Sequence, residues 1–279
     1  MTLRAYSELQ LSDEQFDRPS CPVRAKVFIC ATGRTGSWLL CRAMIHRGMG
    51  IPHEYFNPRH IGLIGPRCGI HALADGRHLG SDSTARRSYV AALLDRRTIN
   101  GIFAAKIHWA QYAAYLDNPE GDELLQNAHF IYLYREDLLA QAISFHIAKE
   151  TGRWGPDATV GSPPAQNPRF FDVDLIDVRV KLLAEAGMNW RLFFARNGIS
   201  PLTFSYEQLR ADPGGVLRAV VDGFGLDVPA SCSDYVEAAP SDARDVQVPP
   251  RREIRARYLL AHQRVVPAMP DDAGGAAGP

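Results

Sequence analysis

The stretch VFICATGRTGSWLLCRAM, from Val27 to Met44, decides the fold. Its first residues, Val27–Cys30, are apolar and predict a buried strand, and its last residues repeat apolar side chains at helical spacing. Between them lies a turn rich in glycine, hydroxyl groups and one arginine. Gly33 and Gly36 free the backbone to point N–H groups inward, and the following helix adds its positive N-terminus. The stretch predicts an anion-binding turn; a glycine turn with a Ser/Thr helix cap is the alternative.

The cation of this turn is Arg34, where nucleotide-hydrolysing loops carry a lysine. A guanidinium is a planar, permanently charged fork that suits phosphate or sulfate oxygens. A P-loop would place lysine directly after the second glycine, but Ser37 and Trp38 follow Gly36 here. An ATP- or GTP-dependent kinase of related fold is therefore only the second hypothesis.

Predicted strands and helices alternate along the rest of the chain. This order is typical of an α/β fold with a parallel sheet and helices on both faces. Ligands bind such sheets at the carboxyl ends of the strands, where the glycine turn, Lys106–His108 and Arg135 all fall. The segment 51–69 reads as an exposed loop, and 155–167 reads as a loop or lid. The expected strands are 27–30, 101–107, 129–134 and 202–205; the expected helices begin near 37, 84, 138, 174 and 212.

Composition narrows the class of protein. The 279 residues are 46% hydrophobic, and 31 basic residues balance 31 acidic ones, which gives no overall field for nucleic acid or anionic membranes. No apolar run approaches the roughly 20 residues that span a bilayer, and no secretory signal is visible. Five cysteines without CxxC spacing argue against a disulfide framework and a zinc site. We expect a cytoplasmic protein: a loose polar arm (1–22), one α/β domain (23–268) and a disordered tail (269–279).

Several ordered segments together resemble the PAPS-dependent sulfotransferases, and most closely the bacterial trehalose 2-sulfotransferase family. ATGRTGSWLLC is similar to that family's phosphosulfate loop, and GIPHEYFNP resembles its G-x-P-x-E-[YF]-F segment. YREDLLAQAISFHIAKETGRW resembles its R-x-D-x-x-x-Q-A-[IV]-S…TG-x-W helix, and the chain beyond Met188 keeps its W-x-x-x-F…Y-E-x-L-x-x-D-P layout. The resemblance runs from about Val27 to Leu226, and it implies a sulfotransferase fold related to P-loop proteins.

The resemblance also implies a donor, 3′-phosphoadenosine 5′-phosphosulfate (PAPS), and transfer of its sulfuryl group to a hydroxyl without a metal. Arg135 and Ser144 correspond to binding residues for the 3′-phosphate, and Tyr206 would lie near the adenine. The turn would hold the 5′-phosphosulfate through Thr32, Gly33, Arg34, Thr35, Gly36, Ser37 and Trp38.

The catalytic base is assigned from the same resemblance. Glu54 occupies the position of the family's suggested base, and Arg34 would stabilise charge on the departing phosphate. His108 is the rival base, because Lys106 and His108 loosely resemble a lysine–histidine segment of the wider cytosolic enzymes. Trp38 replaces an expected threonine, which supports a third hypothesis, a non-catalytic nucleotide-binding protein.

The acceptor is expected to be a small molecule with a free hydroxyl group. The resemblance points to a sugar, a glycolipid or another natural product, and it makes a homodimer reasonable. Nothing in the sequence names the acceptor itself.

Overall fold

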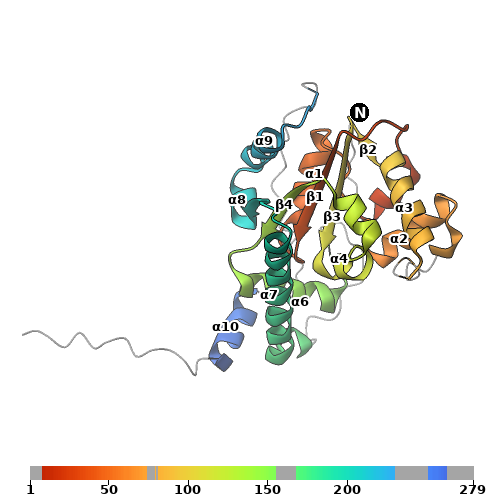
Figure 1. Ribbon diagram of the computed structural model, residues 1–279. Helices are drawn as coiled ribbons and strands as arrows, with labels where there is room; N and C mark the ends of the chain where they lie inside the picture. Colours follow the sequence, from red (N-terminus) through yellow and green to blue (C-terminus); the bar gives the residue numbers. More distant parts are fainter. Residues whose placement is uncertain (1–7, 74–78, 80, 155–167, 230–250, 263–279) are drawn as a thin grey trace, which may run out of the picture.

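The computed structural model describes residues 8–73, 79, 81–154, 168–229 and 251–262. The described part builds a single sheet with helices packed against it (Figure 1). The strands are β1 (Ala25–Ala31), β2 (Thr98–Ile99), β3 (Ile102–His108), β4 (His129–Tyr134) and β5 (Leu202–Ser205). The helices are α1 (Ser37–His46), α2 (Pro58–Arg67), α3 (Ser83–Arg96), α4 (Trp109–Tyr115), α5 (Pro119–Leu125), α6 (Leu138–Thr151), α7 (Val173–Arg196), α8 (Tyr206–Ala211), α9 (Pro213–Phe224) and α10 (Arg251–His262).

The sheet has the strand order β2-β3-β1-β4-β5. All neighbours run parallel except β2, a short edge strand that is antiparallel to β3. Ala31, the last residue of β1, lies opposite His108 on β3 and Leu133 on β4. The parallel α/β fold is confirmed, and the carboxyl ends of the strands meet at one edge as expected.

Successive side chains of β1 point to opposite faces of the sheet and pack into two separate hydrophobic cores. Val27 and Ile29 pack on one face with α1, α8 and α9. Phe28 packs on the other face with aromatic residues of α4 and α7, and its ring lies stacked 5.9 Å from that of Phe130. A strand buried on both faces reads as a continuous apolar run, which is why the sequence located β1, β3 and β4 closely.

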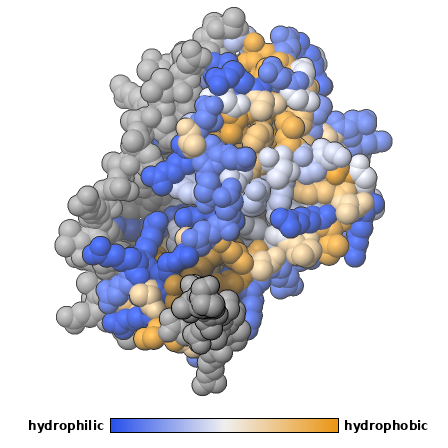
Figure 2. All heavy atoms as spheres, turned by 90° about the vertical axis from the view of Figure 1, so that its left-hand side faces the viewer, coloured by the Kyte–Doolittle hydropathy of each residue, from blue (hydrophilic) through white to orange (hydrophobic). Residues whose placement is uncertain are grey.

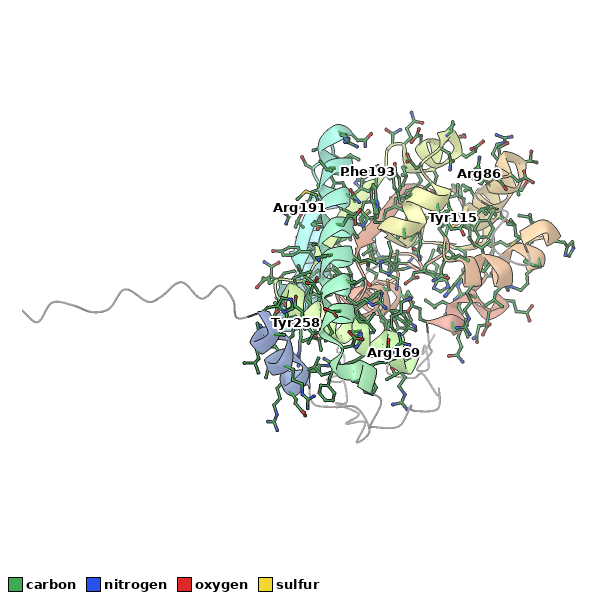
Figure 3. All side chains as sticks on the ribbon, turned by 90° about the horizontal axis from the view of Figure 1, so that it is seen from below. Arg86, Tyr115, Arg169, Arg191, Phe193 and Tyr258 are labelled. Atoms are coloured by element: carbon green, nitrogen blue, oxygen red, sulfur yellow. The ribbon has the colours of Figure 1, made fainter. Side chains whose placement is uncertain are left out.

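A third cluster joins α6, α7 and α10 below the sheet. The Tyr258 hydroxyl of α10 donates to Asp177 of α7 at 3.1 Å, and Figure 3 shows Tyr258 beside that helix. The expected apolar stripe of α7 is only partly buried, because Val178 is 50% and Leu182 45% exposed. The face carrying α8, α9 and α10 alternates hydrophobic and hydrophilic patches (Figure 2). No described helix is long and apolar enough to cross a membrane.

The expectation of an exposed loop at 51–69 is wrong. Tyr55 and Phe56 are fully buried, and α2 begins at Pro58. Asn57 caps this helix by accepting from the Arg59 N–H at 3.1 Å. Proline fits the first helical position because its missing N–H would be unpaired there anyway, so the prolines that suggested a loop partly mark a helix start. The structure also adds four short elements that we did not expect: β2, α4, α8 and α10.

The described part of the N-terminal segment is packed, not loose. Leu11 is completely buried, and Phe16 is nearly so. The buried Arg97 guanidinium donates to the Leu11 carbonyl and forms an ion pair with Asp17 at 2.7 Å. The expectation of a loose arm is therefore wrong for residues 8–17. The boundaries at 22 and 268 stay predictions, and the expected lid (155–167) and tail (269–279) lie outside the described residues.

Truncating the buried leucine of this segment tests its packing. We expect Leu11→Ala to lower the free energy of unfolding by about 2–5 kcal/mol, because it leaves a cavity in a closed core. Leu9→Ala, two residues away and 36% exposed, is the matched control and should change it much less. Urea unfolding measures both variants, and equal effects would show that this segment is not anchored.

Candidate active site

The turn after β1 leaves the N-terminus of α1 open. Gly36 is the N-cap in a left-handed conformation (φ 74°), and no side chain caps the helix. The Ser/Thr-cap alternative is therefore wrong: Ser37 is the first helical residue, not the cap. The first N–H groups of a helix have no partner within the helix, so they can bind an anion.

Arg34 turns toward α6. Its backbone is left-handed (φ 68°), which is uncommon for a residue other than glycine. Its Nε donates to the Ser144 hydroxyl at 3.0 Å, and its Nη1 donates to the Trp154 carbonyl. Arg34 and Ser144, which we predicted to bind opposite ends of the donor, thus contact each other directly.

Buried hydrogen bonds fix the shape of the turn. Gln141 of α6 donates through Nε2 to the Thr32 hydroxyl and the Gly33 carbonyl, both at 2.7 Å. Thr35 is completely buried, and its hydroxyl donates to the Thr32 carbonyl at 3.0 Å. Thr32 and Thr35 therefore hold the turn in this state, and their contact with a ligand stays a prediction. Gln141 was missed, although it lies within the helix motif that carried the resemblance.

Tyr206 joins the turn to Arg135. A Cβ at Gly36 would stand 2.5 Å from the Tyr206 ring, so only glycine fits against it. On the other side, the Arg135 guanidinium carbon lies 4.6 Å from the ring centroid. The Arg135 Nε is buried, and no described residue accepts a hydrogen bond from it; the nearest carboxylate, Glu207, is 3.8 Å away. The two predicted anion sites are therefore neighbours.

Three arginines gather around this region. Burial lowers the pKa of Arg34, and the charges of Arg251 and Arg135 lower it further. Burial also lowers the pKa of Arg135, and the positive charge of Arg251 contributes to lowering it. Like charges held together favour an anionic partner, so this set of residues fits a ligand with separate phosphate or sulfate groups.

Glu54 is the centre of the second half of the site. Its Oε1 lies 2.8 Å from Lys106 Nζ and 3.0 Å from His108 Nε2. Its Oε2 accepts from Asn57 Nδ2 at 2.9 Å and from Gln111 Nε2 at 2.8 Å. A carboxylate offers about four lone-pair sites, so these four donors occupy all of them. Asn57 and Gln111 were missed because neither residue type signals a site by itself.

Comparison with known proteins agrees with this geometry. Residues 26–245 match the family described as Stf0 sulphotransferase. The chain belongs to this family. It is 26% identical over 248 residues to the trehalose 2-sulfotransferase of Mycobacterium tuberculosis (strain ATCC 35801 / TMC 107 / Erdman), covering 78% of this chain and 90% of the relative. It is 25% identical over 230 residues to the trehalose 2-sulfotransferase of Mycolicibacterium smegmatis, covering 71% and 84%.

Solved structures of other sulfotransferases are more distant. The sulfotransferase domain from the curacin biosynthetic pathway has a TM-score of 0.45 at 15% identity, covering 88% of this chain and all of that one. The sulfotransferase from Alicyclobacillus acidocaldarius has a TM-score of 0.40 at 16% identity, covering 87% and 97%. The family match therefore makes this chain a sulfotransferase enzyme, and the hypotheses of a kinase and of a non-catalytic protein are set aside.

The Glu54 cluster of this sulfotransferase is charged. Burial alone would raise the pKa of Glu54, but Lys106 and His108 hold it well below 4.5. Burial would lower the pKa of Lys106, yet Glu54 and Glu8 raise it. Glu8 of the N-terminal segment forms an ion pair with Lys106, a long-range contact that no local sequence pattern predicted. The cluster is a buried carboxylate–ammonium pair with a second carboxylate at its rim.

His108 links the cluster to the glycine turn. Its Nδ1 faces the Ala31 carbonyl at 3.0 Å, and its Nε2 faces Glu54, so both ring nitrogens point at acceptors. Only the doubly protonated ring can donate in both directions. Burial lowers the pKa of His108, but Glu54 outweighs burial and raises it. These contacts and the raised pKa both favour the imidazolium form of His108.

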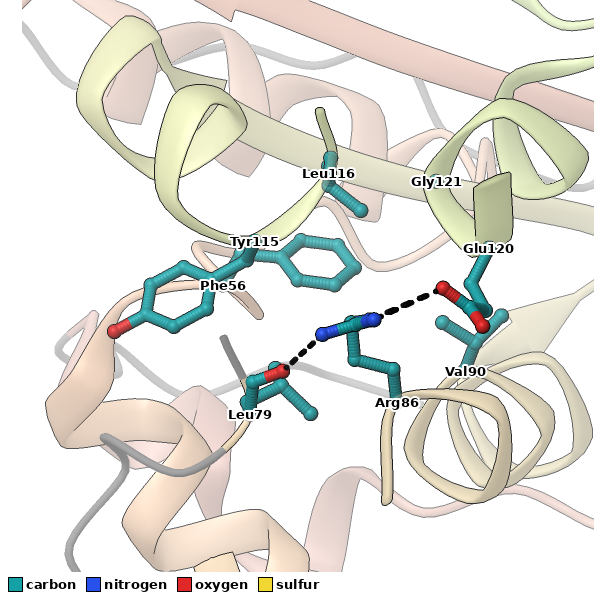
Figure 4. A pocket seen from close by; sticks show the side chains of 8 residues that line it. All are labelled: Phe56, Leu79, Arg86, Val90, Tyr115, Leu116, Glu120 and Gly121. Carbon is teal, nitrogen blue, oxygen red and sulfur yellow. Dashed lines mark hydrogen bonds and ion pairs between the residues drawn. The ribbon is translucent and has the colours of Figure 1, made fainter. Parts of the chain in front are cut away.

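Trp38 and a separate hollow lie away from these contacts. The half-buried Trp38 ring packs against the cluster of Leu11, Phe16, Ile45 and Ile51, so its contact with the donor stays a prediction. The hollow in Figure 4 contains the Arg86–Glu120 ion pair. None of its lining residues belongs to the site. Among the described residues, no three His, Cys, Asp or Glu side chains gather as metal ligands.

The depressed pKa of Glu54 predicts how acid affects the fold. A carboxyl group whose folded pKa is below its unfolded pKa stabilises the fold above the unfolded value, and this contribution is lost as pH falls through the folded value. The difference in unfolding free energy between the wild type and Glu54→Gln should stay constant above about pH 5 and change as pH falls below 4.5. Glu14→Gln, on an exposed site of the N-terminal segment, is the control. Urea unfolding across pH measures both, and a difference independent of pH would contradict the shift.

Proposed function

We propose that this enzyme transfers the sulfuryl group of PAPS to a hydroxyl of a carbohydrate or natural-product acceptor, with Glu54 as the base. The observation that carries the proposal is the contact of Tyr206 with both Gly36 and Arg135. It brings the open end of α1 close to the Arg135 guanidinium, whose buried Nε has no hydrogen-bond acceptor among the described residues, at one sheet edge. A nucleotide with two anionic ends is the ligand that such a pair of sites suits.

Each predicted donor contact has a physical basis in the chain. The N-terminus of α1 and Arg34 suit the 5′-phosphosulfate, and Arg135 suits the 3′-phosphate. Arg251 adds a third positive charge that the family resemblance alone did not assign. PAPS would supply an activated sulfuryl group whose displacement resembles phosphoryl transfer, which requires positioning and charge stabilisation more than covalent chemistry.

The hydrogen bonds favour Glu54 over His108 as the base. Both nitrogens of His108 face acceptors and so donate, whereas the oxygens of Glu54 only accept, and a neutral amide donor on Oε2 can give way to the acceptor hydroxyl. Burial is outweighed by neighbouring charges that lower the pKa of Glu54, and Glu54 contacts His108, whose other ring nitrogen reaches the Ala31 carbonyl at the end of β1. His108 is better suited to orient Glu54 and to place positive charge near the leaving phosphate.

A sugar acceptor is supported by the curated relatives. Both are named trehalose 2-sulfotransferases, and the chain covers 90% and 84% of their lengths. Carboxylate and amide side chains, such as those of Glu54, Asn57 and Gln111, are suitable partners for sugar hydroxyls. Trehalose is therefore the first acceptor to test.

Donor binding can be tested without an acceptor. We expect 3′,5′-bisphosphoadenosine at 100 times its dissociation constant to stabilise the protein by about 2.7 kcal/mol. Arg34→Ala and Arg135→Ala should each weaken binding by about 1.5–3 kcal/mol, because each removes hydrogen bonds to a charged group. Arg24→Ala is the control, since Arg24 precedes β1 at the opposite end of the strand and pairs with Asp227. Unchanged calorimetric affinity in both test variants would overturn the donor assignment.

The base can be tested by turnover. Glu54→Gln should lower kcat with PAPS and trehalose by roughly 10²–10⁴-fold, while bisphosphate affinity stays near that of the wild type. Mass spectrometry detects the sulfated sugar. Full activity in Glu54→Gln would remove Glu54 from the mechanism.

A further inference from the structure

The two oxygens of Glu54 have different surroundings. Lys106 and His108, both cationic, hold Oε1, whereas the neutral amides of Asn57 and Gln111 hold Oε2. Adding a proton to Oε1 would place it against two positive charges. Oε2 carries no such penalty, so it is the oxygen with the greater proton affinity.

Both amides are fixed at their other ends by backbone groups. The Asn57 carbonyl oxygen accepts from Arg59 N and so caps α2. The Gln111 carbonyl oxygen accepts from His108 N at 3.0 Å, as the reciprocal partner in the cap of α4. Only the NH₂ group of each can therefore face Glu54. Each NH₂ carries two protons, and the described residues accept only one of them.

We propose that Oε2 of Glu54 takes the acceptor's proton and that Asn57 and Gln111 are the positioning residues that prepare this oxygen. The inference rests on the proposed function, because it requires Glu54 to be the base. The acceptor hydroxyl replaces one amide N–H on Oε2, and the released N–H bonds to an oxygen of the acceptor. A polyhydroxylated acceptor, with a second oxygen beside the reacting hydroxyl, suits this exchange.

In the transfer step two bonds break and two bonds form. The acceptor O–H bond breaks and its proton goes to Oε2, while the acceptor oxygen forms a bond to the sulfur of the phosphosulfate donor. The S–O bond to the donor's 5′-phosphate breaks, and its electron pair leaves with the bisphosphate. Lys106 and His108 stay on Oε1 and keep the other half of the carboxyl group in place.

The pKa of Glu54 depends on groups from each of the elements around it. Lys106 and His108 lower its pKa from β3, and the Asn57 hydrogen bond lowers it from the start of α2. Removing an amide donor should raise it, because that donor stabilises the charged form. The other titratable groups coupled to this cluster are Glu8, Cys41, His53 and His60.

Two variants with matched controls test the proposal. Gln111→Met removes the amide without adding charge, and Gln208→Met is its control because Gln208 fills the same capping position in α8. Asn57→Asp keeps the helix cap but replaces NH₂ by an oxygen. Asn118→Asp is its control, since Asn118 caps α5 before a proline in the same way. All four variants should show the cooperative unfolding of the wild type.

Two measurements decide the outcome. In protein labelled with ¹³C-glutamate, the Glu54 carboxyl signal, assigned by its loss in Glu54→Gln, should titrate at least about one pH unit higher in both test variants than in their controls. With PAPS and trehalose, kcat/KM should fall roughly tenfold or more, and its acid limb should move to higher pH. An unmoved Glu54 titration in both test variants overturns the inference. Full activity of Glu54→Gln would instead overturn the proposed function.

Discussion

The parallel position of β1 between β3 and β4 is the constraint on which the site depends. Its register sets Ala31 opposite His108, so the last carbonyl of β1 accepts from the His108 ring and from the Trp190 indole at 3.2 Å. Beyond Ala31 the chain leaves the sheet, and the glycine turn begins one residue later. A shift of one residue in β1 would turn its side chains to the opposite core and separate Glu54 from the turn. The proposed anion site and the proposed base are therefore held in register by the same strand.

Charge compensation around Lys106 is the second organising feature. An ammonium group that is 2% exposed requires a partner, and two carboxylates distant in sequence provide it. Buried ion pairs rarely stabilise a fold more than well-packed apolar residues would, because desolvation offsets the attraction. Stability alone is thus a weak explanation for this cluster. Chemistry is the better one, since a fixed carboxylate beside an anion site is what proton removal from an acceptor requires.

Much of the fold followed from local patterns, because buried parallel strands are continuous apolar runs. The bounds of β4 and β5 agree with the expected strands, and α7 begins one residue before its expected start. The loop predicted for residues 51–69 missed helix α2, because proline and glycine signal loops on average. Here Asn57 and Pro58 form the cap and the first turn of that helix. A loop that is buried in the fold has no periodic pattern of apolar residues, so its burial cannot be recognised in the sequence.

The candidate site was predictable only where residue type and chain position coincide. Arg34, Glu54 and Arg135 stand out because they follow glycines or strand ends in a recognisable order. Glu8 and Gln141 act through contacts with residues 98 and 109 positions away, respectively, and no local pattern encodes such distances. Sequence could therefore name Arg34, Glu54 and Arg135, but neither Glu8 nor the neutral side chains that fix their orientation.

The backbone at Arg34 supports the proposal that the turn binds an anion. A left-handed conformation costs a residue other than glycine about 1–3 kcal/mol, and glycine would adopt it freely. The turn already contains Gly33 and Gly36. A third glycine, at position 34, would be enough for the backbone conformation alone. Arginine instead gains bonds to Ser144 and Trp154, which fix its guanidinium against α6 and the chain that follows it. A cation fixed before the ligand arrives loses little freedom on binding. The left-handed arginine therefore fits the proposed anion site, to which glycine would bring no charge.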